Sequence, residues 1–480
     1  MKVLTRLAVA TVLLALIALP AAADYKLARA IKDLERAFKH RDKPNLANTM
    51  QNIREREEAL TKDDAEALRG RATELMTAGP KKLPELETAN QGASKLDYKV
   101  THDNVIYHNY ALLDLPEGIA ADKPVPLCIG LHSFKGTSWY ELSGLRSCIR
   151  ARENHPLADA IIACPQALNR GTSSDDPADA PREGRKQYFG WGPDERGVAT
   201  VIRLLEELTA LYNIDRDRVY LTGIGMGGEG AFFLASVYPS LFAAICPRDA
   251  HPPLWYPKLE AGDAQGIEKL RKAEAVEDGD VEFPWLESLR QTRVCWVHAD
   301  GDRVYPTSFA KLARKRLDAL GGKVDYHEYE GFHASGSTAL ISEALAGMAS
   351  TSRPADTGEV YVRASTSAGV YRNRWLEIVE PLPLENPRGH IWAKAAAGWA
   401  RAKIDREKNR IVVECDRVSS LRFHLDDGLI DLNRPIVVVV NGKEKPPQSA
   451  RRLNSTIIDT ALNFSRSGNV YFAEIGTKAR

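Results

Sequence analysis

The segment that most constrains the fold lies near the middle of the chain, where an apolar strand meets a glycine-rich turn. Residues 219–224 read Val-Tyr-Leu-Thr-Gly-Ile, and four of the next six residues are glycine. An apolar run at residues 231–235 follows at once and favours a helix. Glycine permits strained backbone angles and close passage of neighbouring elements. The segment therefore predicts a strand, a tight turn and a helix in direct succession, as in an α/β domain.

The turn has the spacing of the nucleophile elbow, Gly-x-Ser-x-Gly, in which a serine stands on a strained turn at the head of a helix. Gly225 occupies the position of that serine. Because glycine tolerates strained dihedral angles better than serine does, we expect the turn to persist and only the hydroxyl to be lost. The alternative is a strand–turn–helix of another kind, such as a nucleotide-binding turn. Segments farther along the chain favour the elbow, because they follow it in the order that a hydrolase of this kind requires.

Residues 1–23 have the pattern of a signal peptide. Basic residues precede an apolar run at residues 7–19, and Ala21-Ala22-Ala23 offers a small-residue cleavage site. We expect the mature chain to begin at Asp24 and the protein to be exported to a periplasm or to the medium. An uncleaved anchor helix is the alternative, but the run is short for a membrane span. No second stretch is long enough to cross a membrane, so we expect no span after the leader is removed.

The composition is that of an ordinary globular protein. Lys and Arg number 65 and Asp and Glu number 64, so the net charge of +1 gives no reason to expect nucleic acid as a partner. Four of the six cysteines, Cys128, Cys164, Cys246 and Cys295, lie in apolar strand-like runs, which favours buried free thiols over disulfides. No cysteine belongs to a CxxC pair, so we expect no metal, and we expect no cofactor.

The pattern of apolar and charged residues changes twice after the expected signal peptide. Residues 24–95 carry charges and apolar residues at helical spacing, which predicts a helical segment that packs on the main domain or on a partner. Residues 96–350 alternate apolar strands with helices, which predicts an α/β fold with a doubly wound sheet. Residues 351–480 are strand-rich and contain the hairpin signal Asn441-Gly442, which predicts an all-β, sandwich-like domain. The helices expected in the α/β part begin near residues 137, 196, 231, 307 and 336.

A resemblance to a known family supports this interpretation. Residues 217–228 read Asp-Arg-Val-Tyr-Leu-Thr-Gly-Ile-Gly-Met-Gly-Gly. This motif resembles that of the secreted esterase group of the α/β-hydrolase superfamily, which includes polyhydroxybutyrate depolymerases, feruloyl esterases and acetylxylan esterases. The resemblance covers residues 96–350 and implies a mostly parallel, eight-stranded sheet with the nucleophile turn after the fifth strand. Residues 351–480 resemble the C-terminal domain that accompanies some hydrolases of this type.

The resemblance also implies an acid and a base for the catalytic site. In this fold they follow the nucleophile in that order along the chain. Asp302 lies in Asp-Arg-Val-Tyr-Pro, which matches the acid loop of the family, and Asp300 is the alternative. His333 lies in Gly-Phe-His, which matches the base loop. Asp302 would orient the imidazole and stabilise its protonated form.

The oxyanion hole of such a site uses backbone N–H groups from two segments. One is the residue after the nucleophile position, Met226, and the other is the loop after the third strand, which contains Ser133 and Phe134. The family usually has His-Gly in that loop, whereas this chain has His132-Ser133, so we expect a narrower hole. Ser133 is a conceivable replacement nucleophile, but its loop differs from the elbow, so we expect Asp302 and His333 to serve it only after a rearrangement.

The expected ligand is a small-molecule ester or a ligand linked to a polysaccharide. Residues 189–192 resemble the site-lining loop of the family, so Trp191 is expected to contact the substrate or to pack, and His132 is a further candidate contact. In the last domain, Trp392 and Trp399 either stack on a sugar or belong to the core.

Three functions remain open from the sequence. The first is an impaired or non-catalytic hydrolase relative that binds a polysaccharide, an ester or a peptide, because Gly225 cannot form an acyl-enzyme. The second is an active carboxylic-ester hydrolase in which Asp302 and His333 use a water or another nucleophile. The third is a scaffold or interaction protein that acts through its N-terminal helices or its β-domain.

Overall fold

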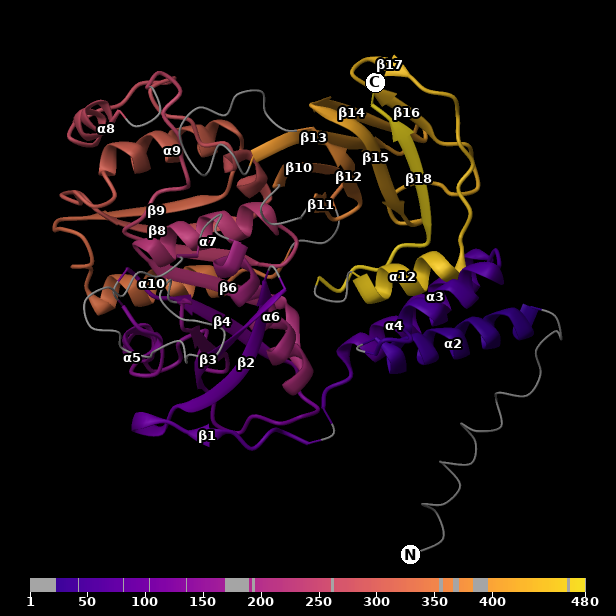
Figure 1. The fold of residues 1–480 in the computed structure, drawn as a ribbon, viewed down its shortest axis with the longest axis horizontal. Coiled ribbons are helices and arrows are strands. Elements are labelled where there is room, and N and C mark those ends of the chain that lie inside the picture. The colour runs from indigo at the N-terminus through magenta and orange to yellow at the C-terminus, as the bar shows by residue number, and fades with distance from the viewer. Residues whose placement is uncertain are drawn as a thin grey trace, which may run out of the picture.

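The chain folds into two units that lie side by side (Figure 1). The structure is a computed structural model, and it describes residues 23–41, 43–80, 82–102, 104–134, 136–168, 190–191, 195–259, 263–353, 357–365, 371–382, 396–463 and 467–479. The expected signal peptide lies outside the described residues, except for Ala23. Nowhere in these ranges is a helix both long enough and apolar enough to cross a membrane.

A nine-stranded sheet forms the centre of the first unit. Its spatial order is β1-β2-β3-β5-β4-β6-β7-β8-β9, and the strands from β5 to β9 in that order run parallel. Strand β3 is antiparallel to both of its neighbours, β2 and β5. The strands are β1 (Glu87–Thr88), β2 (Ser94–His102), β3 (Val105–Asp114), β4 (Val125–Leu131), β5 (Ile161–Pro165), β6 (Ile214–Ile224), β7 (Ala244–Arg248), β8 (Arg293–Ala299) and β9 (Val324–Tyr329).

This order, with the glycine-rich turn after β6, is that of the α/β-hydrolase fold, and the predicted fold class is confirmed. The eight expected strands are β2 to β9, and β1 adds a two-residue edge that the sequence did not indicate. Every residue of β4 is buried, because helices cover both faces of the sheet.

The helices divide between the two faces of the sheet. One face packs against α5 (Ser138–Ile149) and α10 (Thr338–Ala349), and the other against α6 (Glu195–Leu211), α7 (Met226–Val237) and α9 (Thr307–Ala319). A further helix, α8 (Ala264–Arg271), and the short 3-10 helices η1 (Asn90–Gly92) and η2 (Leu286–Gln291) lie in connections. The sequence pattern did not indicate α8.

The second unit contains two sheets. Their orders are β10-β13-β14-β16-β17 and β11-β12-β15-β18. The strands are β10 (Glu359–Ser365), β11 (Arg372–Asn373), β12 (Leu376–Pro381), β13 (Ala396–Asp405), β14 (Arg410–Asp416), β15 (Val418–Leu425), β16 (Val437–Val440), β17 (Lys443–Glu444) and β18 (Ala473–Lys478). The predicted β-domain is present, but it also contains a helix, α12 (Asn454–Asn463). Trp399 stacks on Tyr361 at 5.8 Å within this unit, and Trp392 lies outside the described residues.

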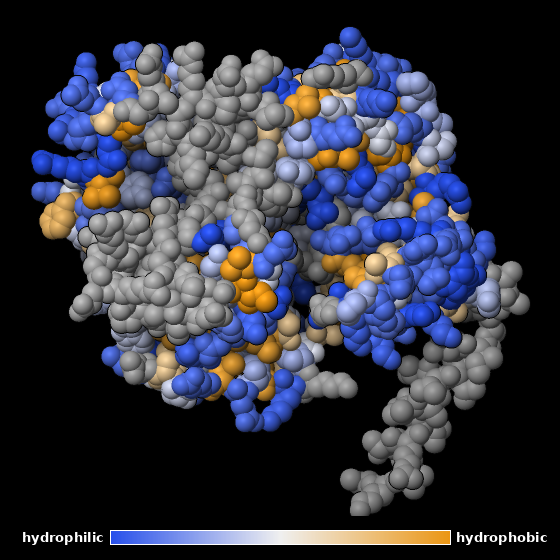
Figure 2. Space-filling view, viewed as in Figure 1, coloured by the Kyte–Doolittle hydropathy of each residue, from blue (hydrophilic) through white to orange (hydrophobic). Residues whose placement is uncertain are grey.

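The N-terminal helices belong to this second unit. Helices α2 (Ala23–His40), α3 (Leu46–Glu55) and α4 (Lys62–Thr77) share one apolar core with the β-domain and with α12 (Figure 1). The visible outer face of this helical group is mainly hydrophilic, as Figure 2 shows. Their apolar stripes therefore face the β-domain, as amphipathic helices on a core require.

Candidate active site

The elbow is formed at the end of β6 as the sequence predicts. Gly225 has φ 54° and ψ −115°, in the region that favours glycine, and α7 begins at the next residue. Its N–H donates to the carbonyl oxygen of Arg248 at 2.9 Å, and its own carbonyl accepts from the N–H of Glu229 at 2.9 Å. The turn is thus built without a side chain at the position that a nucleophile would occupy.

Asp302 and His333 meet beside this turn. Nδ1–H of His333 donates to Oδ2 of Asp302 at 2.8 Å. The other oxygen of Asp302 accepts from the N–H groups of Val304 and Tyr305 at 2.8 and 2.9 Å. The carboxylate is buried and fixed from both sides, so it holds the imidazole with its Nε2 lone pair pointing away.

This carboxylate also changes the basicity of the imidazole. Partial burial lowers the pKa of His333, but the hydrogen bond to Asp302 and the negative charge of that group outweigh it, and the net pKa is raised. Asp300, the alternative acid, is exposed, and its Oδ1 accepts from the N–H of Gly331 at 3.0 Å. Asp300 therefore shapes the loop that carries His333, and Asp302 is the group that contacts the imidazole.

The imidazole faces the elbow. A Cβ atom built on Gly225 would lie 2.9 Å from Nε2 of His333. The same point lies 2.8 Å from Oγ of Ser133, which comes from the loop after β4. From the sequence we expect His333 to serve Ser133 only after a rearrangement; in the structure both side chains lie close to the same point beside Gly225.

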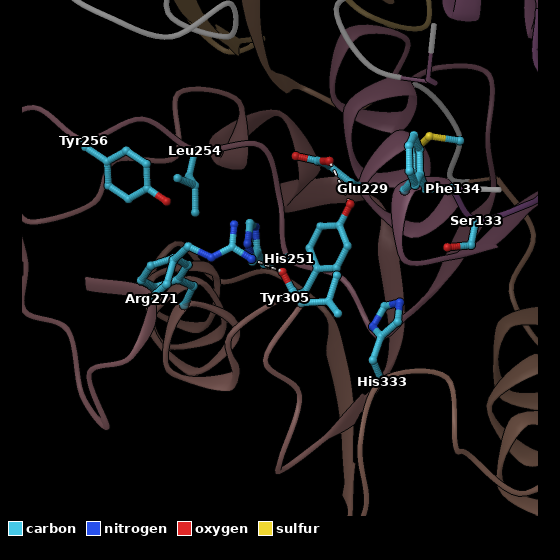
Figure 3. A pocket seen from close by; sticks show the side chains of 12 residues that line it. Ser133, Phe134, Glu229, His251, Leu254, Tyr256, Arg271, Tyr305 and His333 are labelled. Atoms are coloured by element: carbon cyan, nitrogen blue, oxygen red, sulfur yellow. Dashed lines mark hydrogen bonds between the residues drawn. The ribbon is translucent and has the colours of Figure 1, made fainter. Parts of the chain in front are cut away.

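A cavity of about 520 Å³ opens next to these groups (Figure 3). Ser133 and His333 lie close together at one end, and Arg271 and Tyr256 lie at the other. The lining residues are Ser133, Phe134, Met226, Glu229, His251, Leu254, Tyr256, Arg271, Val304, Tyr305, Phe309 and His333. Apolar and aromatic side chains with a few converging polar groups are typical of a small-molecule site.

All three residues expected in the oxyanion hole line this cavity. They are Met226, Ser133 and Phe134. Met226 is the first residue of α7, so its N–H lies at the helix end that has no intrahelical acceptor. The partial positive charge of that helix end also favours an anion. Their assignment to an oxyanion hole stays a prediction.

The two expected substrate contacts, Trp191 and His132, do not line the cavity. Both are buried beneath the loop that carries Ser133. Trp191 is fully buried, and its Nε1–H donates to the carbonyl oxygen of His132 at 2.9 Å. His132 is also buried, and burial lowers the pKa of its imidazole to about 4. Its Nε2 accepts from the N–H of Ala167 at 3.0 Å, so its Nδ1–H donates to the carbonyl oxygen of Ser133 at 2.8 Å. Both residues support the loop that carries Ser133.

Sequence reasoning missed five polar residues of the cavity, Glu229, His251, Tyr256, Arg271 and Tyr305. Glu229 lies one helical turn after Gly225, and its Oε2 accepts from the hydroxyl of Tyr305 at 3.2 Å. Burial raises the pKa of Glu229 to about 7. The Tyr305 ring stacks on His333 at 5.8 Å. The spacing of Glu229 from the elbow and the place of Tyr305 in the acid loop were available signals, but no motif points to Arg271 or His251.

Across the ranges that the structure describes, no group of three or more His, Cys, Asp or Glu side chains has a geometry that would hold a metal ion. All six cysteines are free thiols in the structure, and five of them are buried.

Several solved structures are similar to part of this chain. A thermostable esterase is 23% identical with a TM-score of 0.37, over 54% of this chain and 63% of that protein. A ferulic acid esterase is 15% identical with a TM-score of 0.37, over 53% of this chain and 96% of that protein. A glucuronoyl esterase from Solibacter usitatus is 15% identical with a TM-score of 0.38, over 59% of this chain and 91% of that protein.

No protein-family model and no curated protein matches the chain. The chain also spans less than two thirds of the length of the thermostable esterase. The fold is therefore assigned from the order and connections of its own strands, and the candidate site from its own geometry.

Proposed function

We propose that this protein is an esterase-like hydrolase relative that binds a carboxylic ester, free or linked to a polysaccharide, in the cavity beside His333. The carrying observation is that Nε2 of His333 is aimed, with support from Asp302, at an elbow that has no side chain. A base is present where an ester carbonyl would be attacked, and the elbow hydroxyl is absent. Turnover is therefore expected to be strongly impaired relative to an intact triad.

The expected chemistry follows from what remains. His333 in its neutral form can take a proton from a water or a hydroxyl, and Asp302 stabilises the resulting imidazolium. Gly225 cannot form an acyl-enzyme, so the covalent route through the elbow is lost. Binding and oxyanion stabilisation alone leave about 10³–10⁴-fold acceleration over water in comparable serine hydrolases.

The test is hydrolysis of short-chain p-nitrophenyl and feruloyl esters by the parent, by His333→Ala and by Gly225→Ser. His327→Ala is the matched control, because His327 lies on β9 and does not line the cavity. We expect slow turnover in the parent, its loss in His333→Ala and no change in His327→Ala. If His333→Ala leaves the measured turnover unchanged, the proposed site is wrong.

A purely binding role is the second candidate, and the missing elbow hydroxyl favours it. Calorimetric titration with a non-hydrolysable ketone or amide analogue of each ester separates the two. Saturable binding without measurable turnover would favour the binding role, and turnover that requires His333 would favour the hydrolase.

We also infer that the protein is exported, with a mature N-terminus at Asp24. The basic residues, the apolar run and the alanine site at the start of the chain support this. N-terminal sequencing of the protein recovered from a bacterial periplasm should begin at Asp24, and a product that keeps Met1 in the cytoplasm would contradict it.

A further inference from the structure

We propose that Ser133 supplies the nucleophilic hydroxyl of this site in place of the missing elbow hydroxyl. The proposal rests on the proposed function, because it needs an ester in the cavity and His333 as its base. It adds a nucleophile on the opposite loop, which the motif at Gly225 does not indicate.

The first observation is proximity. Oγ of Ser133 and Nε2 of His333 both lie within 3 Å of the point where a Cβ of residue 225 would stand. The two atoms are therefore less than about 6 Å apart, and no side chain at position 225 separates them. A change between staggered rotamers moves a serine Oγ by about 2 Å, so the proposal requires a rotation about χ1 that shortens this separation.

The second observation is that the space for Ser133 depends on the glycine. A Cβ at position 225 would lie 2.8 Å from Oγ of Ser133, closer than real Cβ contacts. A side chain on the elbow and the present position of the Ser133 hydroxyl therefore exclude each other. The absence of a side chain at Gly225 therefore leaves room for the hydroxyl of Ser133 on the facing loop.

The third observation is that the backbone of Ser133 is held firmly while its hydroxyl is not engaged. The carbonyl oxygen of Ser133 accepts from Nδ1–H of His132 at 2.8 Å and from the N–H of Gly136 at 2.9 Å. Within the described part of the chain, no protein group forms a hydrogen bond with the hydroxyl of Ser133, which lines the cavity. A fixed backbone with an unengaged hydroxyl suits a nucleophile that must meet a bound ester.

The proposed reaction balances in atoms and in protons. Oγ of Ser133 attacks the ester carbonyl carbon while its proton passes to Nε2 of His333. The tetrahedral intermediate collapses with cleavage of the carbon–oxygen bond to the alcohol, which leaves with the proton from His333. Water then attacks the acyl-Ser133 with His333 as base, which releases the carboxylic acid and restores the hydroxyl. The amino end of α7 at Met226 faces the same cavity and can stabilise the oxyanion.

The test is covalent trapping together with kinetics on the full chain. The parent, Ser133→Ala, His333→Ala and the control Ser147→Ala are treated with a fluorophosphonate, and the labelled peptide is mapped by mass spectrometry. Ser147 is exposed on α5, away from the cavity. We expect one label on Ser133 in the parent and in the control, and none in Ser133→Ala. We also expect kcat/KM for p-nitrophenyl esters to fall at least about 100-fold in Ser133→Ala, with binding of a non-hydrolysable ketone or amide ester analogue retained.

The outcomes separate this inference from the proposed function. If Ser133→Ala keeps the parent turnover while His333→Ala loses it, a water is the nucleophile and the Ser133 proposal is overturned alone. Absence of any label in the parent also overturns it. If His333→Ala leaves turnover unchanged, the proposed function fails as well. Ser133→Cys provides a check that does not need turnover, since its alkylation by iodoacetamide should slow in the His333→Ala background.

Discussion

At the scale of single residues, the candidate site combines a fixed Asp302–His333 pair with an elbow position that carries no side chain. The carboxylate of Asp302 accepts three hydrogen bonds, two from backbone N–H groups and one from His333. These bonds fix the direction of the imidazole without any contribution from Gly225. The imidazole of His333 therefore faces an open position in a defined direction, and single substitutions can test whether it acts as a base.

The first such test combines Gly225→Ser with Ser133→Ala. A side chain at position 225 is strained at φ 54° and would crowd Ser133 and His333, at a cost of about 1–3 kcal/mol. Gly225→Ser alone should therefore gain little turnover. In that background Ser133→Ala should raise kcat/KM by about 10²-fold, because it removes the crowding oxygen, whereas in the parent it should lower kcat/KM. The same sign of effect in both backgrounds would show that the two positions do not compete.

A second prediction concerns pH. The raised pKa of His333 means that the neutral, base-competent form is lost as pH falls through a value above 6.5. A proton NMR titration of its imidazole should give a midpoint above 6.5. Asp302→Asn should lower that midpoint, because the negative charge that stabilises the imidazolium is gone, and should reduce kcat by about 10²–10⁴-fold. An unchanged midpoint in Asp302→Asn would contradict the assignment of Asp302.

The sequence indicated which residues follow the ends of the strands. It did not indicate in which direction a side chain on a neighbouring loop points. Asp302 and His333 were predicted because their loops match the acid and base motifs of the family that the sequence resembles, and the structure places their side chains in contact. The nearness of Ser133 to His333 was not found, since a linear motif does not state which way a side chain on a neighbouring loop points. Trp191 was given a cavity role as one of two possibilities, but its ring packs inside, under the loop of Ser133.

At the scale of elements, the elbow depends on how closely α7 approaches the end of β4. A Cβ on Gly227 would lie 1.9 Å from the carbonyl oxygen of Leu131, and that backbone atom cannot move aside. Gly227→Ala should cost about 2–3 kcal/mol of unfolding free energy, as for an overpacked core. Gly144→Ala on α5 is the control, since nothing lies within 4 Å of its Cβ. Equal midpoints of urea unfolding for the two variants would contradict this account.

The first turn of α7 also carries a pH-dependent group. Burial raises the pKa of Glu229 to about 7, so the folded protein binds a proton that the unfolded chain has lost above its ordinary value of 4.5. Its contribution to stability is full below pH 4.5 and is lost as pH rises through 7. Glu229→Gln keeps an acceptor for Tyr305 and has no charge to bury. Between pH 4.5 and 7.5, its unfolding free energy should therefore rise relative to the parent by on the order of 1–3 kcal/mol.

Urea unfolding at several pH values measures this difference. Glu328→Gln is the control, because Glu328 is exposed on β9 and does not line the cavity. A difference between Glu229→Gln and the parent that does not change with pH would show that the carboxyl is ionised throughout.

The elements themselves were largely predictable because the sheet is buried on both faces. Fully buried parallel strands such as β4 read as apolar runs, and their alternation with helices specifies the layers. Helix α8 was missed because it is short and only Ile267 and Leu270 of its residues pack, partly buried, against the core. Helix α12 was missed because it lies within a strand-rich segment of the last domain.

At the scale of the whole molecule, the helices at residues 23–77 fold together with the C-terminal β-domain. The N–H of Leu60 donates to the carbonyl oxygen of Arg452 at 2.8 Å. Arg69 pairs with Asp426 at 2.8 Å and lies 4.6 Å from the ring of Phe472. The sequence could not indicate this, because periodicity shows that a helix has an apolar face but not which distant segment covers it.

This arrangement predicts that the N-terminal helices stabilise the β-domain rather than the candidate site. Leu68 on α4 is fully buried in the core that these parts share, so Leu68→Ala should cost about 2–5 kcal/mol. Hydrogen exchange measured by mass spectrometry should increase in α2 to α4, α12 and β10 to β18. The sheet from β4 to β8 should keep its protection, because it belongs to a separate core.

Leu205→Ala provides the reciprocal control. Leu205 lies on α6, is 2% exposed and belongs to the core of the large sheet, so it offers the same substitution in the other unit. Its effect on exchange should appear in α6, β2 and their neighbours and leave the β-domain protected. Within the described ranges, polar pairs such as Arg290 with Glu359 at 2.6 Å join the two units, and such pairs transmit little stability. If both variants raise exchange throughout the chain, the protein unfolds as one cooperative body and the N-terminal helices stabilise the candidate site after all.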